Sequence, residues 1–252
     1  MTRADRLAKG IYWDRSLNCF TGCSPVGAGC DNCWAKRTAE GRLRGRCGYP
    51  ADEPFRPTFH PERLSQVNSK QKPQVIALCF MSDPFHEGHR IEDKVSMLHT
   101  IVDCSQHTFI ALTKRYEQMK DFLYNYTNLW LEGKPIPNLI GGLSVWDQES
   151  ADRMTPILLQ TNLATRIVSL EPLLEGILLW GLDEIDGLII GCESSPRRRP
   201  CELAWIYDIV DQAKEIGTPV FIKQLDINGK VSHNPEEWPA DLRIRELPEV
   251  MS

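Results

Sequence analysis

Short apolar segments alternate with amphipathic stretches over most of the chain. From residue 74 the apolar segments read VIALCFM, HTFIALT, NLIGGLSV, TRIVSL, GLIIG and PVFIK. Between them lie stretches with helical composition, such as DKVSMLHTIVDCS, YEQMKDFLYNY, DQESADRMTPILLQT and ELAWIYDIVDQAKEIG. Apolar strands that alternate with helices are typical of buried parallel strands in repeated βα units. With a first strand near residues 10–17, the pattern predicts about seven strands in an α/β fold, a partial or complete TIM-like (β/α) barrel.

The rest of the chain fits one domain. No linker or internal repeat divides residues 1–252, so we expect a single barrel domain. Residues 41–72 are rich in glycine, proline and charge without a sustained period, which predicts a long connection with one short strand near Thr58. Residues from about 226 to 252 form a C-terminal tail.

A cysteine-rich loop, NCFTGCSPVGAGCDNCW, occupies residues 18–34 and places Cys23, Cys30 and Cys33 within eleven residues. A structural zinc site normally has four protein ligands, whereas a 4Fe-4S cluster can leave one iron open. Three cysteines on one loop therefore favour a cluster with an open iron. The alternative is a zinc site completed by Cys19, a nearby histidine or another chain.

The surroundings of these cysteines agree with a loop that wraps a cluster. Glycines at 22, 27 and 29 allow positive φ and close backbone approach. The run WAKRTAEGRLRG directly after Cys33 has helix-forming composition, so we expect a helix there. Trp34 either shields the cluster from water or is the first core residue of that helix.

Polar residues follow the predicted strands at the point where each strand ends. Because the carboxyl ends of parallel strands meet at one edge, these residues are expected to surround one mouth, on which the cysteine loop also opens. In chain order they are Ser82, Asp83, Thr113, Lys114, Arg115, Ser144, Asp147, Gln148, Glu171, Glu193, Ser194, Lys223 and Gln224. Any one of them can instead be a helix cap or part of a solvated turn.

Composition narrows the setting. The chain is 42% hydrophobic and 25% charged, which is ordinary for a protein that buries a full core. No apolar run reaches the roughly 20 residues that span a bilayer, and MTRADRLAKG lacks the apolar stretch of a signal peptide, so we expect a cytoplasmic protein. Nine cysteines without an export signal favour reduced thiols. A net charge of -5 leaves only a local basic patch for nucleic acid, and the run Arg197, Arg198 and Arg199 is the candidate.

Seven stretches spread over residues 18–224 carry a resemblance: NCFTGCSPVGAGCDNCWA, FMSDPFHE, HTFIALTKR, GGLSVWDQESADRM, SLEPLL, GCESSP and FIKQ. In order and spacing they resemble a phage and bacterial protein family known for its three-cysteine motif and classed as radical S-adenosylmethionine (SAM)-like. Cys19 stands where that family usually has proline, and Cys192 where it has glycine. The spacing of six and then two residues between the cysteines differs from the three-then-two spacing common among radical SAM enzymes.

The resemblance implies a radical SAM-type barrel with a 4Fe-4S cluster on Cys23, Cys30 and Cys33 and with SAM as the co-substrate. In such enzymes one electron from the cluster cleaves SAM bound at the open iron and yields a 5'-deoxyadenosyl radical, which abstracts hydrogen from the substrate. An electron donor of the flavodoxin or ferredoxin type is the implied partner. If the chain is phage-encoded, its place is the host cytoplasm.

Position around the predicted mouth suggests which residues hold the methionine part of SAM. Asp83, with Ser82, is placed to accept hydrogen bonds from the ammonium. The carboxylate needs a cation, and Lys114 or Arg115 can supply it.

The remaining strand-end residues are placed for the nucleoside part and the substrate. Ser144 and Glu171 suit the ribose diol, and Glu193 suits adenine or substrate. Lys223 and Gln224 close the ring and are assigned to the substrate.

Three further features have two interpretations each. His86 and His89 in DPFHEGH have a spacing that can bind metal, but we expect a solvated loop because no third ligand is evident. Cys192 is expected to pack rather than to touch substrate, and Cys19 to be a spectator. Arg197–Arg199 either grip phosphates or form a solvated charged surface.

The leading hypothesis is a radical SAM enzyme, and the first guess for its substrate is a nucleobase in DNA or RNA, as in hypermodification of a phage genome. A base in a duplex must be flipped out before chemistry inside a barrel can reach it. One alternative is a radical SAM enzyme acting on a free small molecule. The other is a non-catalytic binding module whose loop is stapled by zinc or an iron–sulfur cluster.

Overall fold

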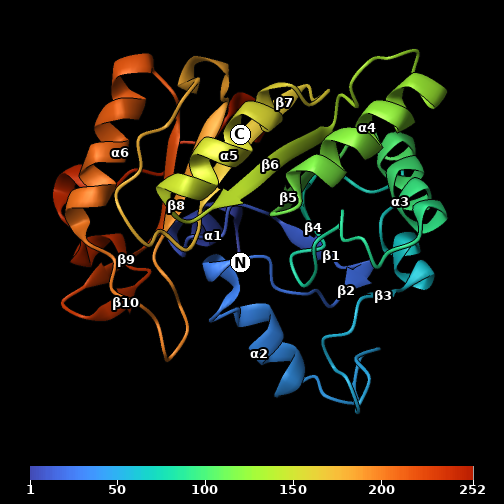
Figure 1. Ribbon diagram of the computed structural model, residues 1–252, viewed down its shortest axis with the longest axis horizontal. Helices are drawn as coiled ribbons and strands as arrows, with labels where there is room; N and C mark the ends of the chain where they lie inside the picture. Colours follow the sequence, from blue (N-terminus) through green and yellow to red (C-terminus); the bar gives the residue numbers. More distant parts are fainter. Residues whose placement is uncertain (252) are drawn as a thin grey trace.

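One large sheet organises the molecule, with helices along its outer face (Figure 1). The computed structural model describes residues 1–251. The strands of the large sheet are β1 (Arg15–Leu17), β4 (Val75–Leu78), β5 (Thr108–Thr113), β6 (Leu139–Val145), β7 (Thr165–Leu170), β8 (Gly187–Gly191), β9 (Val220–Ile227) and β10 (Lys230–Ser232). They lie side by side in this order, and only β10 runs antiparallel to its neighbour. The six strands expected from residue 74 onwards are therefore confirmed, and so is the strand before the cysteine loop.

Four long helices connect most of the parallel strands. They are α3 (Ile91–Asp103), α4 (Tyr116–Trp130), α5 (Gln148–Leu159) and α6 (Leu203–Ile216). Because each strand pairs with the next one along the chain, the sheet winds in one direction, as in a barrel. Within residues 1–251 the first and last strands do not pair, so the sheet is a curled half-barrel and the partial form of the prediction is confirmed.

The apolar pattern explains why these elements form. Every residue of β4, β6 and β8 is buried, as expected for strands covered on both faces. In α4, Met119, Leu123 and Tyr126 are buried at helical spacing, while Tyr124 stays exposed. Asp147, which follows β6, accepts a hydrogen bond from the amide of Ser150 and caps α5, so here the helix-cap interpretation is correct.

The regular alternation breaks between β7 and β8. No α-helix lies between them, only the 3-10 turn η3 (Leu182–Glu184). Pro172, Gly176 and Gly181 interrupt this segment and disfavour a helix. Its apolar side chains, including Leu173 and Ile177, pack into the main core as an irregular segment instead. A repeated βα unit at this position was therefore a wrong prediction.

The N-terminal third supplies the elements around the cysteine loop. They are α1 (Arg3–Ala8), β2 (Phe20–Thr21), η1 (Ala28–Cys30), α2 (Trp34–Glu40), β3 (Thr58–Phe59) and η2 (Pro61–Gln66). The expected helix after Cys33 and the expected short strand near Thr58 are confirmed, and that strand pairs antiparallel with β2.

The C-terminal segment continues from β9 through β10 and three 3-10 turns. They are η4 (Pro235–Glu237), η5 (Ala240–Leu242) and η6 (Glu249–Met251). Among the helices of residues 1–251, none combines the length and apolarity that crossing a bilayer requires.

Candidate functional site

A cavity of about 220 Å³ lies at the carboxyl ends of the parallel strands. It is lined by the three loop cysteines and by all the strand-end residues to which the sequence assigned a ligand. These are Cys23, Cys30, Cys33, Ser82, Asp83, Lys114, Arg115, Ser144, Glu171, Glu193, Lys223 and Gln224. The structure therefore brings most of the predicted ring together at one site, whereas Asp147 and Gln148 belong to the start of α5 and lie outside the lining. Arg197, Arg198 and Arg199 are not part of its lining.

Two glycines fix the course of the cysteine loop. Gly22 has a φ of 78°, and a Cβ there would lie 2.1 Å from the carbonyl oxygen of Arg56. At Gly29 a Cβ would lie 2.7 Å from the ring of Trp146, so only glycine lets the loop rest against this indole. The predicted need for glycine is met by positive φ at one position and by close approach at the other.

The three loop cysteines all line the cavity, and two of their sulfurs accept hydrogen bonds. Cys33 caps α2, with its Sγ 3.5 Å from the amide nitrogen of Lys36. Arg115 Nη1 donates to Cys23 Sγ at 3.3 Å. Over residues 1–251, no three His, Cys, Asp or Glu side chains lie close enough together to hold a metal ion. Binding a cluster at Cys23, Cys30 and Cys33 therefore requires the loop to draw its thiols together.

Burial also affects the first of these thiols. It raises the pKa of Cys23 to about 12, with a further increase from the negative charge of Asp83, while Arg115 opposes both effects. The sulfur is therefore a protonated thiol at neutral pH. Because iron binds the thiolate, metal binding at Cys23 must release a proton.

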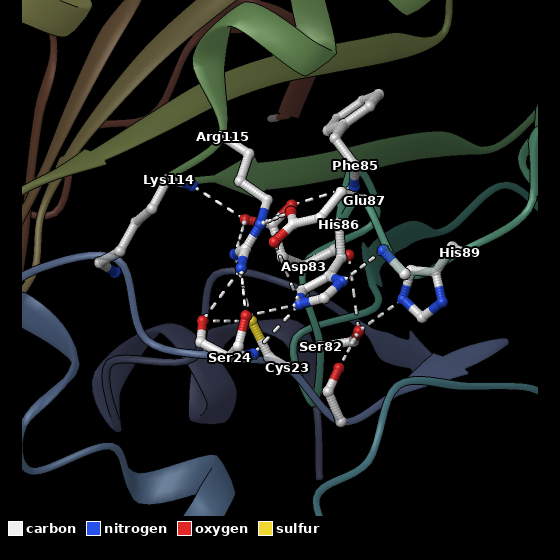
Figure 2. A network of polar contacts seen from close by, with 12 residues as sticks. Cys23, Ser24, Ser82, Asp83, Phe85, His86, Glu87, His89, Lys114 and Arg115 are labelled. Carbon is white, nitrogen blue, oxygen red and sulfur yellow. Dashed lines mark hydrogen bonds and ion pairs between the residues drawn. The ribbon is translucent and has the colours of Figure 1, made fainter.

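Arg115 lies at the centre of a polar network that joins the loop to the sheet (Figure 2). Its side chain is 4% exposed and also donates to Ser24 Oγ at 2.8 Å and to the Ser24 carbonyl at 3.0 Å. On its other side it pairs with Glu87 at 2.5 Å and with Asp83 at 3.5 Å. The guanidinium is thus held by protein groups on both sides.

Asp83 is likewise saturated by protein groups. Its carboxylate accepts the hydroxyl of Thr113 at 2.7 Å, the amide of Phe85 at 3.0 Å and the amide of Lys114 at 3.1 Å. These bonds tie the end of β4 to the end of β5. The Lys114 side chain is different, because its ammonium lies 6.0 Å from the ring centre of Trp146 and forms no ion pair within the described residues.

The two histidines after β4 are buried, so the solvated loop expected for them was wrong. Both His86 and His89 are 5% exposed. His86 Nδ1 accepts the amide of Gly88, and its Nε2 lies 2.8 Å from Ser24 Oγ and 3.2 Å from the Ser24 amide nitrogen. His89 lies 3.1 Å from Ser82 Oγ and stacks on Phe20. The two histidines thus contact the cysteine loop at Ser24 and at Phe20. The sequence spacing does not indicate this role.

The far side of the cavity holds a second charged pair. Glu171, after β7, pairs with Lys223 Nζ at 2.9 Å and accepts Gln224 Nε2 at 3.3 Å. Gln224 also donates to the Cys192 carbonyl at 2.8 Å. These residues link the ends of β7, β8 and β9 across the mouth.

The loop after β8 is clamped to the cysteine loop. Glu193 is 5% exposed and accepts Asn32 Nδ2 at 2.9 Å and Arg199 Nη2 at 2.6 Å. Burial raises the pKa of Glu193, but its hydrogen bonds from Arg199 outweigh this and lower the pKa overall. Arg199 also donates to the Ala28 carbonyl at 2.8 Å and pairs with Asp31 at 3.3 Å.

The three consecutive arginines thus have different environments. Arg199 belongs to this clamp, and Arg198 lies 3.6 Å from Asp226. Only Arg197 is exposed with no hydrogen bond or ion pair of its side chain to the rest of residues 1–251. The sequence run therefore does not form a surface of three free guanidinium groups.

The cavity wall contains polar atoms that the protein leaves without partners. Tyr12 Oη and Gln224 Oε1 are buried and make no hydrogen bond within the described residues. Burial raises the pKa of Tyr12 well above its usual range, so its hydroxyl is a protonated donor. Buried polar atoms are normally satisfied, and an orphaned donor and acceptor in one cavity indicate a polar ligand. These orphaned atoms lie in the same cavity as the three thiols and the Lys114 ammonium, which has no ion pair within the described residues.

Cys19, Cys47, Cys79 and Cys192 differ from the three loop cysteines in burial or position. Cys19 and Cys79 are fully buried with their sulfurs 3.4 Å apart, and neither lines the cavity. Cys192 lines it but is 1% exposed, and burial raises the pKa of its thiol. Cys47 is exposed and away from the cavity. A fourth protein ligand from Cys19 would require its removal from the core.

A family model described as "Protein of unknown function (DUF5131)" matches residues 8–238. The match includes the cysteine loop, all strands of the large sheet and the lining of the cavity. No curated protein and no solved structure matches the chain.

Proposed function

The chain belongs to this DUF5131 family, and we propose that it is a radical SAM enzyme that abstracts hydrogen from a substrate bound at the cavity. One observation carries the proposal: three cysteines of one loop share a single cavity with the polar carboxyl ends of the parallel strands. Barrel-like sheets place their chemistry at this edge.

Cys23, Cys30 and Cys33 are the residues that would hold a 4Fe-4S cluster with one open iron. The cluster would supply the electron for reductive cleavage of SAM, which generates the carbon radical that takes the hydrogen. Arg115 donates an N–H to Cys23 Sγ, and the backbone amide of Lys36 in α2 donates one to Cys33 Sγ. Such donors stabilise negative charge on sulfur and tune the potential of an iron–sulfur centre.

The rest of the cavity offers polar groups to a ligand such as SAM. Lys114 is the cation that remains for the carboxylate, because Arg115 is fully engaged with protein groups. Tyr12 Oη and Gln224 Oε1 are a donor and an acceptor that have no partner among the described residues. Ser144 is a further hydroxyl in the lining.

Aromatic side chains keep the cavity apolar between these polar groups. Trp13, Phe80 and Phe55 line it, as does Tyr12. Tyr12 and Trp13 pack edge to face with ring centres 4.9 Å apart. A wall of this kind excludes water. A carbon radical needs such a dry site if it is to reach an unactivated C–H bond.

The first test is anaerobic reconstitution with iron and sulfide, followed by reduction with SAM. We expect about four iron and four sulfide per chain and release of 5'-deoxyadenosine. Cys30→Ala should lose both. Cys47→Ala is the matched control, because Cys47 is exposed and outside the cavity, and it should retain both. Stoichiometric zinc without deoxyadenosine would instead support the binding module stapled by zinc.

A further inference from the structure

A short stretch of strongly basic sequence begins directly at the cavity. Residues 34–46 contain Lys36, Arg37, Arg42, Arg44 and Arg46 against the single acid Glu40. Removing these from the chain's totals of 29 basic and 34 acidic residues leaves 24 and 33. The segment is therefore a positive region on a protein that is otherwise distinctly acidic.

Three of these arginines are free to bind a partner. Arg37, Arg42 and Arg46 are exposed, and their side chains make no ion pair or hydrogen bond within residues 1–251. Arg44 is different, because its guanidinium donates to the carbonyls of Glu40 and Ala51. Unpaired guanidinium groups keep their full capacity for bidentate contacts with phosphates.

The segment is a folded element and not a loose tail. Ala35 and Ala39 of α2 are buried against Tyr49 and Met81, with Leu43 packed beside them. Figure 1 shows α2 standing clear of the large sheet at the lower edge of the molecule. The arginines are thus presented on a fixed support that starts at the cluster loop.

An aromatic ring lies where the basic segment meets the cavity. Trp34 follows Cys33, lines the cavity and remains 44% exposed. This exposure contradicts the interpretation of Trp34 as the first core residue of the helix, whereas shielding of a cluster stays a prediction. A large indole that is half open beside a concave site offers a stacking surface for a planar group.

We propose that residues 34–46 bind the phosphates of a single-stranded nucleic acid and that Trp34 stacks on a base at the cavity entrance. Proteins that bind single strands combine a positively charged track with aromatic stacking platforms, and both features meet here. Charge complementarity selects a polyanion, and the indole selects one with planar bases. A single strand is chosen because a base inside a duplex cannot reach a cavity without being extruded.

This inference deepens the proposed function by naming the substrate class, and in that respect it rests on it. It differs from the sequence hypothesis in its location. Arg198 and Arg199, which the sequence indicated as phosphate ligands, are used within the protein. Arg197 is exposed, and its carbonyl accepts Asn32 Nδ2 at 3.1 Å, so it lies beside the same loop and can extend the track.

Binding is measured by fluorescence anisotropy with a labelled single strand of about 12 nucleotides of mixed sequence. The full chain is used both as purified and after anaerobic reconstitution. In the triple variant Arg37→Ser, Arg42→Ser and Arg46→Ser we expect roughly tenfold to hundredfold weaker binding at about 50 mM salt. The slope of log affinity against log salt should fall in magnitude by about two, since each lost phosphate contact removes roughly 0.7.

The matched control removes three charges from the outer helical side of the molecule. Lys134→Ser, Arg153→Ser and Lys214→Ser change exposed positions on or next to α4, α5 and α6. This variant should bind as tightly as the parent. Both triple variants replace exposed residues, and circular dichroism melting checks that each remains folded.

Trp34→Ala tests the stacking platform separately. It should weaken binding about 5- to 100-fold with an unchanged salt slope, and Trp34→Phe should recover part of the loss. Equal loss of affinity in both triple variants, or unchanged binding in the arginine variant, would overturn the proposal. So would polyglutamate or phosphatidylserine vesicles that compete as well as the oligonucleotide. Because the protein is assayed both as purified and after reconstitution, strand binding without deoxyadenosine formation by the reconstituted protein would refute the radical SAM function alone.

Discussion

At the scale of single residues, Arg115 is the most highly connected group of the site. It is 4% exposed and contacts Cys23, Ser24, Glu87 and Asp83. The sequence indicated only that a cation follows β5, which suggested a ligand for SAM. Its engagement with the cysteine loop depends on the approach of segments 92 residues apart, and no local pattern encodes that approach.

Arg115→Met should therefore destabilise the protein. It leaves a buried carboxylate and several acceptors of the loop without their donor, a kind of change that costs about 3 kcal/mol. The partial exposure of Glu87 limits the cost. Urea unfolding measures it, and Arg37→Met, at an exposed unpaired position, should change the unfolding free energy by less than about 0.5 kcal/mol. An Arg115 variant as stable as the parent would contradict this role.

His89 leads to a prediction about acid stability. Its pKa is lowered from 6.5 to about 3, chiefly by burial and also by the neighbouring charges of His86, Lys94 and Arg115, against the opposing effect of Glu87. Below pH 6.5, His89 is therefore protonated in the unfolded chain but stays neutral in the folded protein. Stability should be highest above this pH and fall as the pH decreases toward 3, by on the order of 1 kcal/mol between pH 6.5 and about 5.

His89→Gln removes this titration and should flatten the fall of melting temperature with decreasing pH. The slope should not vanish, because burial also lowers the pKa of His60 and His86, and both contribute with the same sign. An identical pH profile in the variant would show that His89 does not control acid stability.

At the scale of elements, the loop after β8 holds the cysteine loop in place. Arg199 alone connects Glu193, Asp31 and the Ala28 carbonyl. Arg199→Ser should therefore loosen residues 18–34 and accelerate their amide hydrogen exchange. Arg197→Ser is a matched control, because that side chain has no partner in the described part of the chain. Equal exchange in both variants would rule out the clamp.

The helices and strands also show which parts of the fold a sequence pattern predicts. Strands with continuous apolar runs and helices with one buried face were predicted correctly, because burial periodicity is a local signal. The irregular segment between β7 and β8 was not, since its apolar residues fit a core without specifying how the backbone crosses it. The burial of His86 and His89 depends on Ser24, Ser82 and Phe20, which are distant in sequence.

At the scale of the whole molecule, the half-barrel gathers residues from six strand ends and one loop around a single cavity. The sequence predicted most members of this ring, because strand ends of a parallel sheet share an edge, but it wrongly included Asp147 and Gln148 and missed Tyr12. It did not predict which members are consumed by internal bonds. Asp83, Arg115 and Glu193 are engaged in hydrogen bonds and ion pairs within the protein. Lys114, Tyr12 Oη and Gln224 Oε1 have no such partner and are left for a ligand.

The central claim is that the three cysteines leave an iron open for SAM. The most direct measurement is the electron paramagnetic resonance spectrum of the reconstituted, reduced protein with and without SAM. We predict a reduced-cluster signal that changes shape when SAM is added and that is absent in Cys30→Ala. A signal indifferent to SAM, or stoichiometric zinc with no cluster signal, would contradict the account.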